Sequence, residues 1–177
     1  MNKEKIDALR NLKVSKEEAL EWVNILEKEC HVETPLPIVY LKENGCLEAY
    51  PYLDKEKKEQ AFGILINDIV WPLTGQYANV DMFKACHLLK DMFFPSVSDL
   101  MQVRERMPFI KSTFAILRAH EVEADDFLDG VYWTSHMWSN KKEFVRKVYS
   151  VSDAVCYNYD PYRGKKAHLR GCKNFHK

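Results

Sequence analysis

Glycine is scarce in this chain, with six among 177 residues, and the signatures of nucleotide binding that depend on glycine are absent. The sequence contains neither G-x-x-x-x-G-K-[ST] nor G-x-G-x-x-G, whose glycines let the backbone approach a phosphate closely. It also lacks a G-x-S-x-G turn and an H-E-x-x-H helix, which mark two common kinds of hydrolytic site. A phosphate cradle and these two hydrolase chemistries are therefore unsupported.

The chain has no excess of charge of either sign. Its 26 Lys and Arg residues balance 26 Asp and Glu residues, so the formal net charge is zero. No overall field therefore attracts nucleic acid or an anionic membrane surface. A run of about 18 apolar residues, which a membrane-spanning helix requires, is also missing. We expect neither nucleic acid nor a membrane as a partner.

The first residues, MNKEKIDALRNLKV, are charged throughout and lack the apolar core of a secretory signal peptide. The default expectation is a cytoplasmic protein with reduced thiols. A location at the cell surface or in a phage particle stays open as an alternative.

Cysteine occurs five times without a C-x-x-C pair, which indicates neither a zinc knuckle nor a thioredoxin-type site. In an oxidising compartment, Cys156 and Cys172 would be candidates to pair. Asp125, Asp126 and Asp129 form an acidic cluster that could attract Ca²⁺, because hard cations need clustered oxygen ligands. The full spacing of a calcium-binding loop is missing, so we expect a solvated loop, with no metal and no cofactor.

Hydrophobic periodicity and turn residues predict an α+β protein. Ser15 and Glu18 form a capping box that starts a helix reaching about Cys30. Residues 33–37 contain two prolines and predict a linker after that helix. Further strands are predicted at 38–41, 46–50, 61–66 and 68–73, and further helices at 80–90, from 96 onward and at 109–120.

Some local patterns carry more specific expectations. The Asn44-Gly45 pair predicts a tight hairpin turn, because such turns need positive φ angles. Residues 51–60, PYLDKEKKEQ, predict a charged surface loop. Ser96 and Asp99 are placed to cap a helix. Within the predicted helix 80–90, Phe83 and other apolar residues recur at the spacing of one helix face.

Aromatic residues gather in residues 130–172, which contain two of the four tryptophans and five of the nine tyrosines. Alternation at a period near two predicts strands at 131–134, 144–149 and 153–157, with a turn at 160–164. We expect Trp133 in the core. Other aromatic and basic side chains of this stretch are candidates for ligand binding, because they offer rigid contact area and directional donors. These candidates are Trp138, Tyr157, Tyr159, Tyr162 and Arg163.

Four short motifs follow one another along the chain: AFGILI at 61–66, FPSVSDL at 94–100, YWTSH at 132–136 and HLRGC at 168–172. Their order and spacing resemble the bacterial and phage domain family that is named for the C-terminal domain of a collagen-like adhesin. Members of that family are similar to C-type lectins and to the formylglycine-generating enzyme.

The resemblance implies a C-type-lectin-like α+β domain over residues 35–177, with a twisted antiparallel sheet and flanking helices. An N-terminal helical segment over residues 1–34 precedes this domain and lies outside the resemblance. Some lectin-like relatives are variable proteins of diversity-generating retroelements, whose binding residues sit on the C-terminal sheet and its loops. The enzyme relatives oxidise a substrate cysteine with a pair of reactive cysteines, and Cys156 and Cys172 do not fit that pattern.

We therefore expect a non-catalytic recognition domain that binds a protein or a glycan. Two other functions stay open. A structural or assembly subunit of a phage or a surface appendage would use the N-terminal helices, with Trp22, to oligomerise. An enzyme with an unrecognised site would need a cleft that perturbs an ionisable group such as Cys156 or His136. The oligomeric state is not determined by these patterns.

Overall fold

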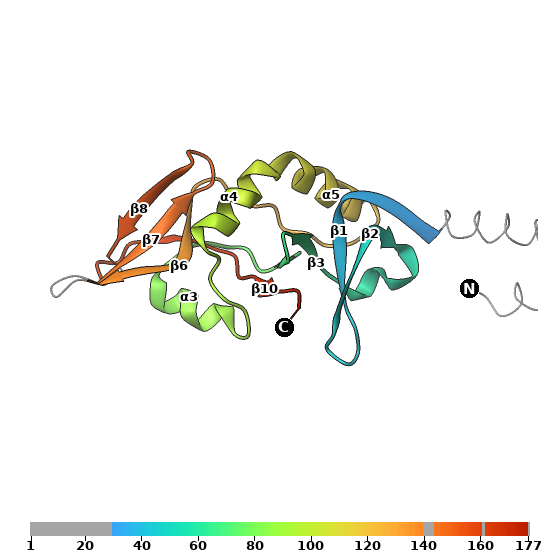
Figure 1. Ribbon diagram of the computed structural model, residues 1–177, viewed down its shortest axis with the longest axis horizontal. Coiled ribbons are helices and arrows are strands. Elements are labelled where there is room, and N and C mark those ends of the chain that lie inside the picture. Colours follow the sequence, from blue (N-terminus) through green and yellow to red (C-terminus); the bar gives the residue numbers. More distant parts are fainter. Residues whose placement is uncertain (1–29, 140–143, 161, 177) are drawn as a thin grey trace, which may run out of the picture.

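The computed structural model describes residues 30–139, 144–160 and 162–176. These residues form an α+β fold with two five-stranded sheets and a few helices (Figure 1), which confirms the predicted fold class at that level. The predicted helix that starts at Ser15, together with Trp22, lies outside the described residues.

The first sheet has the strand order β10-β4-β3-β1-β2, and all of its pairings are antiparallel. Each of its strands except the short β10 contains a segment that had been predicted as a strand. Its strands are β1 (His31–Leu41), β2 (Leu47–Asp54), β3 (Ala61–Ile66), β4 (Ile69–Pro72) and β10 (Lys173–Asn174).

The predicted Asn44-Gly45 turn joins β1 to β2. The backbone N of Lys42 donates to the carbonyl of Cys46 at 2.9 Å, which closes the hairpin. Gly45 has a φ of +81°, a conformation that costs glycine little because it has no Cβ. The side-chain oxygen of Asn44 accepts from the backbone N of Cys46 at 3.0 Å.

The predicted linker over residues 33–37 is wrong, because β1 already begins at His31. The register with β2 is interrupted between Glu33 and Ile38, and the two prolines lie in this interruption. Proline lacks an N–H and is tolerated where the ladder is broken. Leu36 lies in the same interruption, is buried, and donates its backbone N to Thr113 Oγ1 at 3.2 Å.

The predicted loop over residues 51–60 is also wrong. Its first four residues complete β2, where Leu53 is buried, and the rest forms the short 3₁₀ helix η1 (Lys55–Gln60). Asp54 caps η1 by accepting a hydrogen bond from the backbone N of Glu56 at 3.0 Å. A charged composition had hidden the buried apolar residue and the capping residue that organise this segment.

The second sheet has the strand order β5-β9-β6-β7-β8. Strands β6 and β9 run parallel, and the other neighbours are antiparallel. The three strands predicted within residues 130–172 are confirmed, although β6 continues to Ser139. The strands are β5 (Tyr77–Val80), β6 (Val131–Ser139), β7 (Phe144–Ser150), β8 (Val155–Tyr159) and β9 (Ala167–Leu169).

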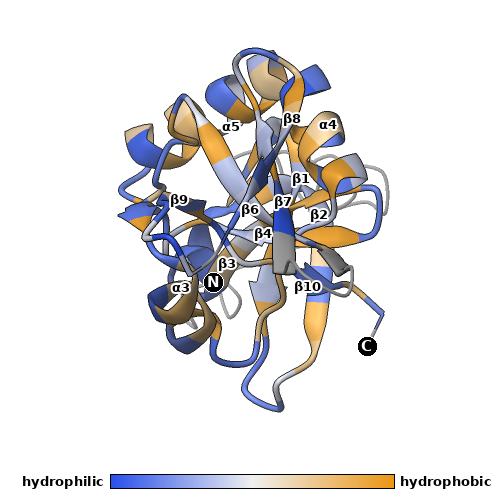
Figure 2. Ribbon diagram, turned by 90° about the vertical axis from the view of Figure 1, so that its left-hand side faces the viewer, coloured by the Kyte–Doolittle hydropathy of each residue, from blue (hydrophilic) through white to orange (hydrophobic). Residues whose placement is uncertain are grey.

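Three helices cover the sheets: α3 (Met82–Leu89), α4 (Val97–Glu105) and α5 (Met107–Ala119). The capping box predicted from Ser96 and Asp99 is present at the start of α4. Helix α3 lies on one side of β6 and β7, and α4 lies on the other (Figures 1 and 2). Hydrophobic and hydrophilic residues alternate along these helices, as expected for elements with one buried face (Figure 2).

The chain passes from the second sheet to the first through Arg170, whose guanidinium is buried. Its Nη2 donates to the carbonyls of Pro72 (2.6 Å) and Leu73 (2.9 Å), and its Nη1 donates to the carbonyl of Asp125 (2.7 Å). The ring of Phe127 lies 4.3 Å from Cζ. Burial lowers the pKa of Arg170 to about 10, so the side chain remains charged at neutral pH.

Replacing Arg170 should destabilise the fold strongly. In Arg170→Met the three carbonyls lose their buried donors, which should lower the free energy of unfolding by roughly 3–5 kcal/mol. The matched control Arg163→Met removes an exposed arginine and should change the free energy of unfolding by less than about 0.5 kcal/mol. Urea unfolding followed by circular dichroism measures both, and equal losses in the two variants would contradict the role given to Arg170.

Candidate functional site

The candidate site lies where β7 and β8 extend beyond the edge of α3. We define the α3–β8 face by Phe83, Arg146, Tyr157, Tyr159 and Tyr162. Side chains directly opposite each other on paired strands lie on the same face of a sheet. The register pairs Arg146 with Tyr159, so these two side chains lie on one face.

The same register connects this face to the core under α3. Val148 pairs with both Trp133 on β6 and Tyr157 on β8, so the three side chains form a row across the sheet. Helix α3 covers Trp133 and Val148, which are fully buried. It does not reach the end of the row, where Tyr157 is 42% exposed.

Trp133 is a core residue, as predicted from the sequence. Its indole Nε1 donates to the carbonyl of Val80 at 2.9 Å. Tyr159 packs edge-to-face on the indole with ring centroids 5.9 Å apart, and is only partly exposed. The Lys165 ammonium lies 5.8 Å from the centroid of the Tyr159 ring. Tyr159 therefore joins the core to the surface of the site.

Helix α3 presents Phe83 to solvent. The side chain of Asp81 caps the helix by accepting from the backbone N of Lys84 at 2.9 Å. The buried residues of α3 are Met82 and Leu89 together with an alanine, and this orientation leaves Phe83 58% exposed. The spacing of apolar residues had placed Phe83 on the same helix face as other apolar side chains, but tertiary contacts select a neighbouring face.

Phe83 packs against Tyr162, with ring centroids 5.8 Å apart and the ring planes tilted by 59°. Tyr162 is 70% exposed and belongs to the turn predicted at 160–164. Asp160 organises this turn, since its Oδ1 accepts from the backbone N of Tyr162 at 2.9 Å. Its Oδ2 lies 3.0 Å from Nε of Arg163. The two rings form an exposed aromatic pair, and local hydrogen bonds hold the backbone of the turn that carries Tyr162.

Arg146 is a partly buried cation on the same face. Its Nη1 donates to the carbonyl of Thr134 at 3.2 Å, and its Nη2 contacts the sulfur of Met137. The guanidinium lies over the ring of Phe94, with Cζ 4.5 Å from the centroid. Burial lowers the pKa of Arg146, which the nearby thiol of Cys86 partly opposes. Within the described ranges, no carboxylate forms an ion pair with Arg146.

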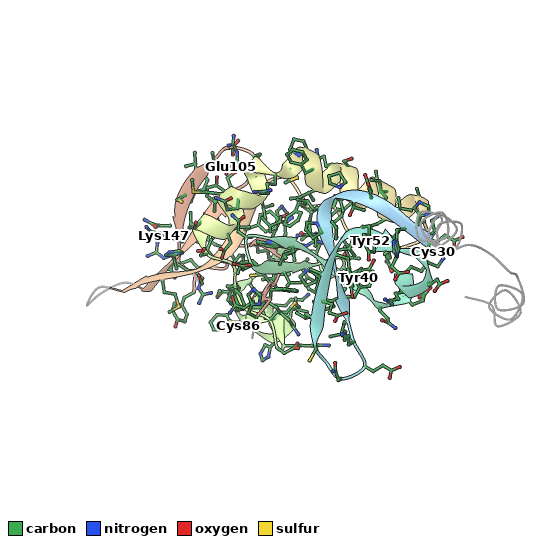
Figure 3. The ribbon with its side chains drawn as sticks, turned by 45° about the vertical axis from the view of Figure 1, so that its right-hand side comes forward. Cys30, Tyr40, Tyr52, Cys86, Glu105 and Lys147 are labelled. Carbon is green, nitrogen blue, oxygen red and sulfur yellow. The ribbon has the colours of Figure 1, made fainter. Side chains whose placement is uncertain are left out.

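A groove of about 540 Å³ adjoins Arg146. Asp99 also lines it, but this carboxylate accepts a hydrogen bond from the backbone N of Ser96 at 2.7 Å in the helix cap. In Figure 3, Cys86 on α3 and Glu105 on α4 mark the two sides of the sheet, with Lys147 on β7 between them. The apolar part of the groove lining consists of Ile69, Leu89, Met92, Phe93 and Phe94.

The structure brings together three of the five candidate residues from the sequence, namely Tyr157, Tyr159 and Tyr162. Arg163 is exposed at the turn and engaged with Asp160. Trp138 pairs its backbone with β7, but its side chain lies outside the described part of the chain. Phe83, Phe94 and Arg146 had not been predicted as site residues. The alternation in β7 signalled that Arg146 shares a face with Val148, but not that a groove lies beside it.

The acidic loop is held by protein partners. Asp125 Oδ2 accepts from the backbone N of Gly75 at 3.0 Å, and Asp126 pairs with Arg118 at 3.1 Å. Across residues 30–139, 144–160 and 162–176, no group of three or more His, Cys, Asp or Glu side chains is arranged to hold a metal ion.

All five cysteines are free thiols. Cys172 is buried, and its Sγ lies 3.6 Å from the carbonyl oxygen of Phe93, to which it donates. Burial raises the pKa of the Cys172 thiol. Cys156 is exposed on β8. His136, the other residue considered for an enzyme site, accepts a hydrogen bond at its ring Nδ1 from the backbone N of Val97 at 3.4 Å.

No family model, no curated protein and no solved structure matches this chain. As for membranes, the helices of the described segments are all too short or too polar to span one.

Thiol reactivity should separate the buried cysteine from the exposed ones. Alkylation of the native protein at pH 8 should modify Cys46, Cys86 and Cys156, because their side chains reach solvent. Cys172 should react only after denaturation, because it is buried and its raised pKa suppresses the thiolate. Mass spectrometry of tryptic peptides measures each site, and rapid native alkylation of Cys172 would contradict the burial described.

Proposed function

We propose that this chain is a non-catalytic recognition domain that binds a protein or a glycan through the α3–β8 face. The observation that carries this proposal is the exposed Phe83–Tyr162 pair on the same face as a partly buried arginine without a described counter-ion. Aromatic rings provide a large contact area and lose little conformational entropy on binding. Such rings and arginine are the side chains that dominate binding energies at interfaces.

The environment of Arg146 supports a role in contacting the ligand. Its guanidinium has already lost part of its hydration in the unbound protein, which its lowered pKa reflects. Its acceptors are a carbonyl and a thioether, both uncharged. A ligand carboxylate or hydroxyl would complete its hydrogen bonds, and charge-assisted bonds of this kind are shorter and stronger than neutral ones. The groove beside it would take an apolar part of the same ligand.

We further propose that the fold is C-type-lectin-like. The four motifs that carry the family resemblance support this, because they fall on β3, at the start of α4, on β6 and on the crossing from β9 to β10. In the lectin-like relatives, binding residues sit on the C-terminal sheet and its loops. Here the aromatic residues of the α3–β8 face come from β8, from the turn after it and from α3.

Ligand binding should depend on the α3–β8 face and not on exposed aromatic residues elsewhere. The chain would be applied to a glycan array and panned against a random-peptide display library. Tyr162→Ala and Arg146→Met should each lower the affinity for a selected ligand by about tenfold or more, which corresponds to about 1.4 kcal/mol of binding free energy.

Phe109→Ala is the matched control, because Phe109 is 53% exposed on α5, away from the site. This variant should bind like the unmodified chain, and all three should keep their melting temperatures within a few degrees. Ligands that bind equally well to the Tyr162 and Arg146 variants would disprove a recognition role for this face. Calorimetry gives the dissociation constants.

A further inference from the structure

The two sheets have four edge strands, and three of them are protected against pairing with another chain. Strand β10 has only two residues. Strand β5 has four, with a register shift and a positive φ of 51° at Asn79. Strand β2 carries Glu48 and Pro51, and η1 packs against it. Short length, irregularity, charge, proline and coverage are the ways in which natural sheets prevent pairing between edges.

Strand β8 has none of these protections within the described part of the chain. Its sequence, Val-Cys-Tyr-Asn-Tyr, contains no charge and no proline. All five residues pair with β7 in an unbroken register, so no bulge twists the strand away. Residues 155–158 are exposed, and no strand of the described chain pairs with the outer edge of β8. It forms the free end of the sheet in Figure 1. A regular edge of this kind offers unpaired N–H and C=O groups.

We propose that β8 pairs with β8 of a second copy of this chain, in an antiparallel arrangement that joins two five-stranded sheets into one of ten strands. Tyr157 is the middle residue, so a two-fold axis through the strand centre brings it opposite itself. Val155 then lies opposite Tyr159 of the second copy, and Cys156 opposite Asn158. Aromatic pairs and aromatic–β-branched pairs are favourable cross-strand neighbours.

Charge also favours a second copy as the occupant. The strand carries no charge, so two identical strands meet without like-charge repulsion. A partner strand with its own charge pattern would find no complementary charge within β8.

The arrangement has a consequence for recognition. A two-fold axis perpendicular to the joined sheet keeps both α3–β8 faces on the same side. Two binding faces would then lie next to each other, and a ligand that reaches both would gain affinity through effective concentration. Pairing of five residues buries little area compared with the roughly 1,200–2,000 Å² of stable interfaces, so the dimer should dissociate on dilution.

Disulfide trapping tests the register directly. Tyr157→Cys would be made in a chain whose Cys30, Cys46, Cys86 and Cys156 are replaced by serine, leaving the buried Cys172 unchanged. Under mild oxidation, thiols at the two-fold axis should cross-link at least about tenfold faster than thiols held beyond about 7 Å between Cα atoms. The control Ser152→Cys places an exposed thiol in the β7–β8 turn, far from the axis. Equal rates for the two variants, or no cross-linked dimer, would overturn the proposal.

Sedimentation of the unmodified chain gives a second measurement that requires no cysteine variant. The dimer fraction should rise with protein concentration, and Asn158→Lys should abolish it, because lysine on an edge strand opposes pairing. A chain that stays monomeric at every concentration would overturn the dimer. Binding of a monovalent ligand at Arg146 and Tyr162 should persist in Asn158→Lys, so failure of the dimer and failure of the recognition site give different results.

Discussion

The buried guanidinium of Arg170 is the interaction on which the arrangement of the two sheets depends. It lies where the chain leaves β9 in one sheet and approaches β10 in the other, and it donates to three backbone carbonyls. A buried charge is tolerated when it is hydrogen-bonded; here Nη1 and Nη2 both donate, whereas the buried Nε has no hydrogen-bond partner among the described residues. Removing the Nη donors would leave the carbonyls unsatisfied. Because the carbonyls belong to segments far apart in the sequence, one side chain joins the end of β4, the acidic loop and the C-terminal strands.

The same crossing shapes the groove beside the candidate site. A Cβ on Gly171 would lie 2.8 Å from Leu89 Cδ2 and 2.9 Å from Met92 Cβ, so the backbone passes α3 at a distance that only glycine allows. Immediately after it, Cys172 exchanges two backbone hydrogen bonds with Phe93, of 3.0 and 3.1 Å. Phe93 lines the groove that adjoins Arg146, so these backbone hydrogen bonds fix the position of one residue of the groove lining.

The α3–β8 face follows from a mismatch between a short helix and a wider sheet. Helix α3 has eight residues and covers the inner strands, where Trp133 and Val148 are buried. The row that begins at Trp133 continues to Tyr157 at the uncovered edge. Aromatic and basic side chains at that edge therefore reach solvent while their backbone remains part of a regular sheet. A rigid support of this kind limits the entropy lost on binding.

Patterns that depend on near neighbours in the chain predicted much of the fold. The Asn44-Gly45 turn, the cap formed by Ser96 and Asp99, and the alternating strands after residue 130 all form as expected, because backbone geometry and local hydrogen bonds decide them. The errors at residues 33–37 and 51–60 have the opposite origin. Prolines and charged residues suggested irregular chain, but residues 33–37 belong to β1, where Leu36 is buried, and residues 51–54 belong to β2, where Leu53 is buried.

What the sequence determined by itself was therefore the class of the fold and most of its elements. It also named Tyr157, Tyr159 and Tyr162 as candidates, and these stay a prediction. Only the tertiary structure decided that Phe83 faces solvent, that Arg146 adjoins a groove and that β8 has a free edge. Each of these depends on which other element lies next to the residue. Helical spacing cannot say which face a neighbour will cover, and alternation cannot say which strand ends a sheet.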